Sequence, residues 1–319
     1  MSKTTDLLEF EPHGIDTLIQ NSGYRVDILR LDRMHPLVSG NKWYKLKYNL
    51  QELKSSGKKT LITFGGAYSN HIAATAATCH AFGIPVQAFI RGEDQADNPT
   101  LAKARESGMK LHFLSRAEYA KKDDPGYIEA LHKRFSDAYI VPEGGSNQLG
   151  IKGCTDILKD VPVYDYVFCA CGTGSTFAGL LRSEKIARAL IGVSVLKGEN
   201  TLPMDITENL MRMDPGHRYN ILGNEILDGP VITEHGITNR YAFSGYAGFD
   251  KSLLKFKLNF EKQFGIVLDH VYTVKMAYAA FDLLQTGRLQ KQSSVLLIHS
   301  GGLQGNIGFE KRYQDKLIL

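Results

Sequence analysis

The sequence has few cysteines, and their spacing offers no metal site. The 319 residues contain four: Cys79, Cys154, Cys169 and Cys171. Zinc sites require two well-separated cysteine pairs, or one pair with two histidines, and neither pattern is present. Cys169 and Cys171 lie two apart on a predicted strand and so point to the same face, where core packing is favoured over a redox pair. We therefore expect no metal.

The chain also lacks any concentration of positive charge and any long apolar run. Its 38 basic and 34 acidic residues give a formal charge of +4 and are spread along the sequence. Binding to nucleic acid requires a concentrated basic patch, and a membrane helix requires about 20 apolar residues. The opening MSKTTDLLEFEPHG shows no secretory signal. We expect a soluble, cytoplasmic protein without nucleic-acid or membrane partners.

Short apolar runs alternate with helical patterns, which is typical of parallel sheets covered by helices on both faces. The sequence predicts an α/β protein with these strands: 26–31, 60–64, 86–91, 110–114, 138–141, 166–170, 190–195 and 294–299. The expected helices are 43–56, 70–82, 100–107, 125–135, 151–158, 176–189, 206–213, 251–263 and 274–286.

The length, with 43% hydrophobic residues, suffices for two cores, since domains usually contain about 100 to 200 residues. No internal repeat, low-complexity tract or long linker marks a boundary. We expect a smaller α/β domain at residues 45–147 and a larger domain formed by residues 1–44 and 148–319.

The clearest chemical motif is CGTGST, at residues 171–176 between a predicted strand and a predicted helix. Glycines let the backbone approach a ligand, the amides at a helix start attract anions, and Ser175 and Thr176 add hydroxyl groups. The motif therefore predicts a monophosphate site at Gly172, Thr173, Gly174, Ser175 and Thr176. It is no Walker motif; a dinucleotide turn and an ordinary strand–helix turn remain alternatives.

Two further segments carry candidate reactive groups. Ser69, Asn70 and His71 follow the strand LITF at the start of a helix, where Ser69 is an N-cap or, alternatively, lies near a reacting carboxylate. His71 alone would more often be a surface or capping residue. Lys42 follows Ser39-Gly40-Asn41 just before a predicted helix, a placement that suits Schiff-base chemistry, although most lysines are solvated surface residues.

A resemblance to a known family connects these motifs. SGNKWYKLKYNL, FGGAYSNHIAATAA, EGGSNQLGIKG, CGTGSTFAG, GYAGFD, LDHVYTVKMAYA and IHSGG occur here in this order. The chain thereby resembles, from about residue 31 to 308, the 1-aminocyclopropane-1-carboxylate deaminases and D-cysteine desulfhydrases. That family belongs to the tryptophan-synthase-β-like group, fold type II, of pyridoxal-phosphate enzymes. The resemblance implies two open, twisted, mostly parallel sheets, with the cofactor in the larger domain, and a homodimer.

The resemblance also assigns roles to individual residues. Lys42 would form the Schiff base with pyridoxal 5′-phosphate, Asn70 would bind its ring hydroxyl, and residues 172–176 would hold its phosphate. Tyr272 would lie against the ring, with Thr273 and Ser300 near the ring nitrogen. Ser69, Asn70, His71 and Tyr246 would surround a small amino-acid substrate, and catalysis would involve Lys42, Ser69, Tyr246 and Tyr272. Lys42 must act as a neutral amine, so we expect its pKa to lie a few units below ~10.4.

Thr273, His71 and Ser300 resemble the desulfhydrase branch, in which the protein would be a lyase that converts D-cysteine to pyruvate, ammonia and sulfide. The alternative is a deaminase, classified among hydrolases, that converts 1-aminocyclopropane-1-carboxylate to 2-oxobutyrate and ammonia. The lysine motif of this chain reads SGNKWYKL. The family usually shows two glycines and a basic residue after the lysine, and this chain departs from that pattern. Outside enzymes, a protein that binds a phosphate ligand or pyridoxal phosphate without catalysis remains open.

Overall fold

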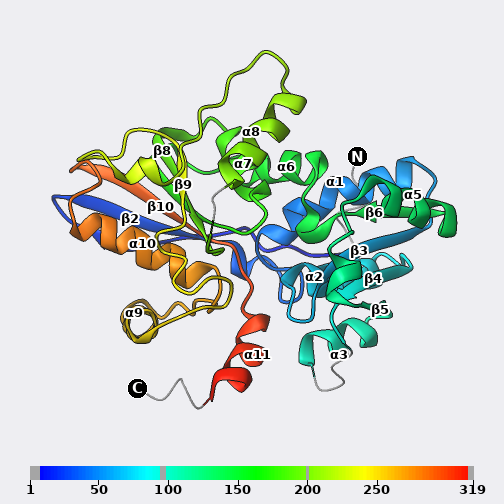
Figure 1. Ribbon diagram of the computed structural model, residues 1–319. Coiled ribbons are helices and arrows are strands. Elements are labelled where there is room, and N and C mark those ends of the chain that lie inside the picture. Colours follow the sequence, from blue (N-terminus) through cyan, green and yellow to red (C-terminus); the bar gives the residue numbers. More distant parts are fainter. Residues whose placement is uncertain (1–7, 94–97, 199–200, 315–319) are drawn as a thin grey trace.

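The computed structural model describes residues 8–93, 98–198 and 201–314, which form two sheets with helices packed around them (Figure 1). The larger sheet has the order β1 (Ile15–Gln20), β2 (Tyr24–Arg30), β10 (Ser293–His299), β7 (Tyr164–Cys171), β8 (Ile186–Ser194) and β9 (Gly236–Thr238). The smaller has the order β5 (Lys110–Leu114), β4 (Val86–Arg91), β3 (Thr60–Gly66) and β6 (Ala138–Val141). All neighbouring strands are parallel except β1 and β2.

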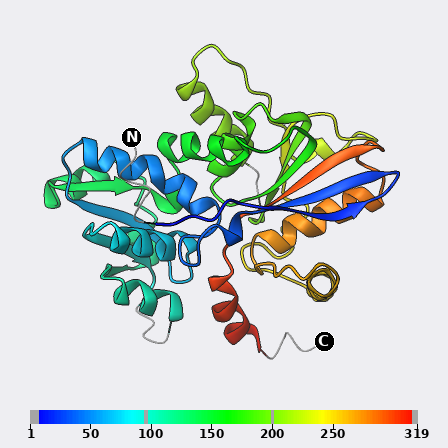
Figure 2. The same ribbon diagram turned by 180° about the vertical axis from the view of Figure 1, so that it is seen from behind.

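The helices lie on both faces of the sheets, as the two opposite views show (Figure 2). They are α1 (Asn41–Ser55), α2 (Asn70–Ala81), α3 (Pro99–Glu106), α4 (Arg116–Tyr119), α5 (Pro125–Arg134), α6 (Gln148–Thr155), α7 (Ser175–Leu181), α8 (Leu202–Met213), α9 (Lys251–Phe264), α10 (Thr273–Gln285) and α11 (Gln304–Tyr313). Within the described ranges, no helix is long and apolar enough to cross a membrane.

Burial on both faces explains the apolar character of the central strand β7. Tyr166 and Phe168 pack into the core on the α10 side, whereas Val167, Cys169 and Cys171 pack into the core on the α7 side. The expectation that both cysteines point to the same face is confirmed, with their Sγ atoms 4.0 Å apart. A parallel strand covered on both sides requires this nearly continuous apolar sequence.

The predicted α/β class is confirmed, but several elements differ from the prediction. The helix expected at residues 176–189 ends at Leu181, because residues 186–194 form β8 and pair with β7. Sequence analysis did not identify β1, β9, α4 or α11. β1 is a half-buried edge strand, β9 has three residues and α4 has four, so none carries a clear apolar period.

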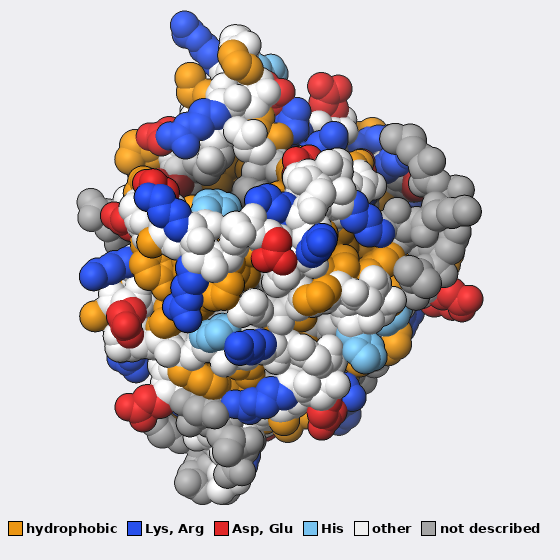
Figure 3. Space-filling model, turned by 90° about the vertical axis from the view of Figure 1, so that its right-hand side faces the viewer, with side chains coloured by type: hydrophobic (Ala, Val, Ile, Leu, Met, Phe, Trp, Pro, Cys, Tyr) orange, Lys and Arg blue, Asp and Glu red, His pale blue; other side chains and the backbone are white. Residues whose placement is uncertain are grey.

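The four-stranded sheet is formed entirely within residues 60–141, while β1 and β2 join the sheet built from the later part of the chain. Basic, acidic and hydrophobic side chains are interspersed on the side of the smaller sheet (Figure 3). The domain boundaries remain a prediction, and the first of them, between residues 44 and 45, would fall inside α1.

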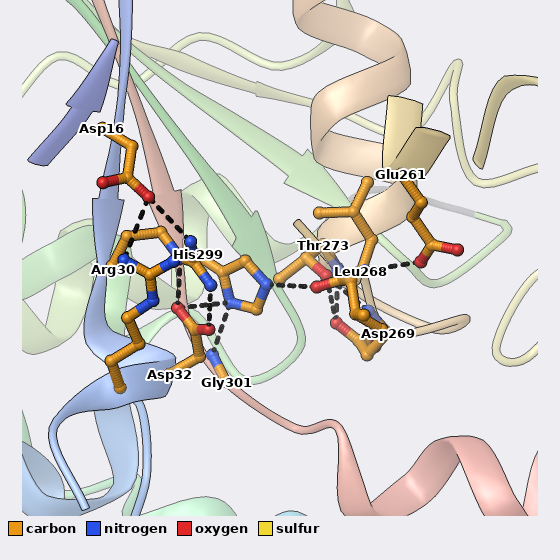
Figure 4. A network of polar contacts seen from close by, with 11 residues as sticks. Asp16, Arg30, Asp32, Glu261, Leu268, Asp269, Thr273, His299 and Gly301 are labelled. Carbon is orange, nitrogen blue, oxygen red and sulfur yellow. Dashed lines mark hydrogen bonds and ion pairs between the residues drawn. The ribbon is translucent and has the colours of Figure 1, made fainter. Parts of the chain in front are cut away.

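Buried charges connect the end of β2 to the end of β10 (Figure 4). Arg30 donates two hydrogen bonds to Asp32, at 2.9 and 2.6 Å, and one to Asp16 at 2.8 Å. His299 Nδ1 lies 3.4 Å from Asp32 Oδ1, and His299 Nε2 is 2.8 Å from the Val267 carbonyl oxygen. Burial alone would raise the pKa of Asp32, but the hydrogen bond from Arg30 and the charges of His299 and Arg30 lower it.

We predict that Asp32→Asn will lower the free energy of unfolding by about 3 to 5 kcal/mol, because it leaves Arg30 buried without its main counterion. Since the pKa of Asp32 is lowered in the folded state, its contribution is present above about pH 4 and is lost as the pH falls further. Urea unfolding at several pH values would measure both effects. Asp228→Asn, in an exposed pair with Arg240, is the control and should cost at most about 1 kcal/mol. Equal losses in both variants would contradict the prediction.

Candidate active site

A cavity of about 360 Å³ lies where the carboxyl ends of strands from both sheets meet. Open parallel sheets commonly bind ligands at this edge. Most of the predicted site residues line the cavity: Lys42, Ser69, Asn70, His71, Gly172, Thr173, Gly174, Thr176, Tyr246, Tyr272 and Ser300. Ser175 and Thr273 do not. Ser175 Oγ instead lies 2.8 Å from Ser146 Oγ.

The backbone at Gly40 fixes the position of Lys42. Gly40 has φ of +72°, and a Cβ built on it would lie 1.9 Å from the Ser300 carbonyl oxygen, so no other residue fits without movement. The amide of Asn41 donates a hydrogen bond of 3.2 Å to the same oxygen. The helix begins at Asn41, so Lys42 lies in its first turn rather than just before it. Lys42 Nζ donates a hydrogen bond of 2.8 Å to Asn41 Oδ1.

Two lysines without acidic partners give the cavity a positive character. Burial, and then the charge of Lys45, lower the pKa of Lys42 to about 7, while Cys154 and Asp269 partly oppose this. The predicted lowering is confirmed. Sequence analysis did not identify Lys45, which is 4% exposed, has a pKa lowered by burial and places Nζ 3.5 Å from Thr173 Oγ1. No described carboxylate forms an ion pair with either lysine, so the cavity suits an anion.

The loop after β7 provides the features that hold a phosphate. The first amides of α7 have no acceptor within the helix, and Thr176 and Phe177 in its first turn line the same cavity as Lys45 and Thr173. Gly172 allows close contact with Tyr272, since a Cβ on it would lie 3.2 Å from the tyrosine ring. Gly174 has φ of +79°, and a Cβ there would lie 2.5 Å from Ile206 of α8, so this glycine permits helix packing.

A residue of α11 contacts the start of α2. Ser69 caps α2 and accepts a hydrogen bond of 3.4 Å from the Ile72 amide. Asn70 Oδ1 accepts a hydrogen bond from Gln304 Nε2 in α11, which leaves Asn70 Nδ2 as the free donor of this amide group. Gly302 passes so close that a Cβ would lie 2.3 Å from that Nδ2. Sequence analysis missed Gln304, because no local pattern connects it to a residue 234 positions earlier.

His71 is a buried neutral imidazole and not the surface residue that its type would suggest. Thr63 Oγ1 donates its one proton to the Val141 carbonyl, so it must accept from His71 Nε2, 2.8 Å away. Burial, followed by the charges of Lys42 and Lys45, holds the pKa of His71 well below its usual value. Nδ1 therefore carries a lone pair and has no partner among the described residues.

Two tyrosines border the cavity on the side of α10. The rings of Tyr246 and Tyr272 meet edge to face, with centroids 6.1 Å apart, and Tyr246 is 50% exposed. Burial is the main reason that both phenol pKa values are raised, so both remain protonated near neutral pH. The loop of Tyr246 is held by Lys275, whose Nζ donates to the carbonyl oxygens of Ala242 at 2.8 Å and Gly245 at 2.6 Å.

The hydroxyl of Thr273 is already committed elsewhere. It donates to Asp269 Oδ2 at 2.6 Å and accepts from the Asp269 amide at 2.8 Å. Asp269 also accepts hydrogen bonds from the amides of Val271, Tyr272 and Thr273 at the start of α10. Thus Ser300, and not Thr273, presents a hydroxyl-bearing side chain to the cavity. Within the described residues, no group of His, Cys, Asp and Glu could hold a metal ion.

The fold and this site fit an enzyme whose cofactor carries a carbonyl and a phosphate group. The sequence profile described as "Pyridoxal-phosphate dependent enzyme" matches residues 17–301, and the chain belongs to this family. Its cofactor is pyridoxal 5′-phosphate. The buried lysines and the α7 amides fit its aldehyde and phosphate groups.

Individual relatives narrow the comparison. The chain is 29% identical over 92% of its length to a Thermotoga maritima protein named "Putative 1-aminocyclopropane-1-carboxylate deaminase", 94% of which is covered. It is 26% identical over 84% of its length to the Arabidopsis thaliana "Bifunctional D-cysteine desulfhydrase/1-aminocyclopropane-1-carboxylate deaminase, mitochondrial", 70% of which is covered. A solved homologue of 1-aminocyclopropane-1-carboxylate deaminase has a TM-score of 0.75 at 24% identity, with 100% of this chain and 99% of that chain covered. This likeness confirms the predicted fold. No relative supports a hydrolase classification.

We predict that Lys42 of the cofactor-free protein will react with formaldehyde and borohydride half-maximally near pH 7, because its amine loses its proton there. Fully exposed lysines should react half-maximally only near the ordinary lysine pKa of ~10.4. Mass spectrometry of the peptides would give both profiles. In Lys45→Met the pH at which Lys42 reacts half-maximally should rise, since a neighbouring positive charge has been removed. Titration of Lys42 together with the exposed lysines would contradict this assignment.

We predict that Lys275→Met will loosen residues 242–248 and raise KM, since two carbonyl oxygens lose their charged donor. Hydrogen exchange of that loop and steady-state kinetics would measure the effects. Lys257→Met is the matched control, because Lys257 is also buried but pairs with Glu261 on α9. The control should leave loop exchange and KM unchanged. Equal exchange in the Lys275 variant and the wild type would rule out this role.

Proposed function

We propose that the protein is a pyridoxal-phosphate-dependent lyase that acts on a small D-amino acid, with D-cysteine as the preferred substrate. The observation that carries the proposal is the arrangement around Lys42. An amine with a pKa of about 7 lies in one cavity with the start of α7 on one side and the start of α2 on the other. Such an amine is substantially neutral at physiological pH and can act as nucleophile and base.

When bound, pyridoxal phosphate supplies an electron sink for the bond that breaks at the substrate Cα. The amides of α7 and Lys45 would hold its phosphate, Tyr272 would lie against its ring, and Asn70 Nδ2 would bind its ring hydroxyl. Lys42 would hold the Schiff-base linkage in the resting enzyme and would take the proton from Cα as a free amine. The start of α2, with Ser69, would orient the substrate carboxylate.

The neighbours of the ring nitrogen favour elimination in this proposal. Ser300 offers a hydroxyl there, and the Asp269 carboxylate is occupied by the start of α10. Without a carboxylate partner the nitrogen would stay largely unprotonated, which suits the loss of a good leaving group from Cβ. For D-cysteine, the Cβ–S electron pair leaves with sulfide, and hydrolysis of the remaining enamine yields pyruvate and ammonia.

The second candidate is 1-aminocyclopropane-1-carboxylate deaminase, and the name of the Thermotoga relative favours it. The Arabidopsis relative is named for both activities, so a change at few residues could alter the preference. We also propose a homodimer in the cytoplasm, in contrast with the mitochondrial Arabidopsis relative. Light scattering of the purified protein and fractionation of its source cells would test these two points.

We predict that the enzyme will release pyruvate from D-cysteine or β-chloro-D-alanine at least about tenfold faster, by kcat/KM, than 2-oxobutyrate from 1-aminocyclopropane-1-carboxylate. A tenfold preference corresponds to about 1.4 kcal/mol in transition-state stabilisation. Keto-acid assays on one enzyme preparation would compare kcat/KM for these substrates. Lys42→Ala should show neither turnover nor the visible absorption of the bound cofactor. Faster 2-oxobutyrate release would favour the deaminase, and no turnover of any small amino acid would favour a non-catalytic protein.

A further inference from the structure

The cavity wall carries one positive charge that a simple amino acid would leave without a partner. Arg91 is the last residue of β4 and pairs in register with Gly66 of β3. A Cβ built on Gly66 would lie 3.8 Å from Arg91 Nη2, so the guanidinium lies beside the turn that leads from Gly66 to Ser69. Arg91 lines the site cavity and also a larger cavity of about 820 Å³ that opens from it.

The groups of a simple amino acid already have positions elsewhere in the proposed site. The amino group belongs at Lys42, the α-carboxylate belongs at the start of α2, and the cofactor phosphate belongs at the start of α7 beside Lys45. Arg91 forms no ion pair with any described carboxylate, and its guanidinium lies 5.9 Å from the centroid of the Tyr119 ring. Arg91 is therefore free to bind a further anion.

The acidic residues nearby do not cancel this charge. Glu143 also lines the site cavity but forms no ion pair with Arg91, and it lies 3.5 Å from Lys122, which pairs more closely with Asp123 at 2.6 Å. The outer cavity contains Asp269, whose carboxylate is occupied by the amides of α10. Glu93 is the other acidic residue among the described residues that line the outer cavity.

The outer cavity has two further arginines on its wall. Arg116 comes from α4 beside the smaller sheet, and Arg312 comes from α11, which extends below both sheets in Figure 1. Neither forms an ion pair with a carboxylate of the described chain. Among the described residues of this wall, three arginines face one available glutamate, a balance that would attract anions toward the site and repel cations.

We propose that Arg91 binds a second anionic group of the substrate, so that the enzyme also accepts small amino acids whose β-substituent is a sulfonate or phosphate. The inference rests on the proposed function and specifies its substrate class. A guanidinium donates two parallel hydrogen bonds to the oxygens of such groups, which matches their geometry. Arg116 and Arg312 direct these substrates into the outer cavity.

The test compares anionic with neutral β-substituents on the holoenzyme. O-Phosphoserine and β-sulfoalanine, each as both enantiomers, are set against D-cysteine and β-chloro-D-alanine. In each reaction Lys42 takes the α-proton, the β-group leaves with its bonding pair as phosphate, sulfite, sulfide or chloride, and one water hydrolyses the enamine to pyruvate and ammonium. We expect Arg91→Gln to lower kcat/KM at least about tenfold for the anionic pair and less than about threefold for the neutral pair.

Arg134→Gln is the matched control, since it removes an exposed cation on α5 that lines neither cavity. It should preserve all four rates, and thermal unfolding should show that both variants remain folded. Equal losses for both substrate pairs in Arg91→Gln would mean that Arg91 binds the α-carboxylate, and this would overturn the proposal. Turnover of the neutral pair without turnover of the anionic pair in the wild type would also overturn it.

A binding measurement separates this inference from the catalytic proposal. α-Methylaspartate and 2-aminoisobutyrate lack an α-proton and differ by one carboxylate, so calorimetry with the holoenzyme reports binding without turnover. Arg91→Gln should weaken the binding of α-methylaspartate by at least about tenfold and leave the binding of 2-aminoisobutyrate unchanged. If no substrate is turned over but this selective loss occurs, the lyase assignment fails and the anion site stands. Equal affinities of the two probes for the wild type would rule out the anion site.

Discussion

The contact of the Gly40 backbone with the Ser300 backbone is the constraint on which the site depends. The Gly40 position leaves no room for a side chain, and the adjacent Asn41 amide donates to the Ser300 carbonyl. This contact joins the first turn of α1, which carries Lys42, to the end of β10. Gly302, two residues further, brings its backbone close to the Asn70 side chain at the start of α2, where a Cβ would lie 2.3 Å from Asn70 Nδ2. Backbone contacts thus place an amine, a hydroxyl and an amide around one cavity, and they do so more rigidly than flexible side chains could.

Electrostatics then determine what this geometry can do. Lys42 and Lys45 lie close together without acidic partners, and the charge of Lys45 lowers the preference of Lys42 for the charged form beyond the effect of burial. Nearby, the acidic residues are occupied: Asp269 by the amides of α10, and Asp32 by Arg30 and His299. The positive charge is therefore left for ligands. A site with this distribution of charge attracts an anionic cofactor and anionic substrates to the same place.

Most of the site could be predicted from the sequence because its motifs are local. SGNK, SNH and TGST each combine a turn with the start of a helix, and the site residues predicted within them line the cavity, apart from Ser175. Residues recruited across the fold could not be found in this way. Lys45 resembles any helical lysine, Gln304 follows no motif, and the bond of Thr273 to Asp269 depends on how α10 begins. In the fold, periodicity identified buried strands but not the short or edge elements β1 and β9, where neighbours rather than sequence set the conformation.

The contribution of α11 has a consequence for how the protein is made. The site needs Gln304 against Asn70, and it needs the Ser300 backbone against Gly40, so it joins the early part of the chain to its last helix. Domains generally fold as units during synthesis, N-terminal parts first, and the four-stranded sheet can form from residues 60–141 alone. The six-stranded sheet must wait for β10, which lies between β2 and β7. During translation β2 therefore has only β1 as a partner until residues 293–299 leave the ribosome, and the cofactor site is complete only after Gln304 has been made.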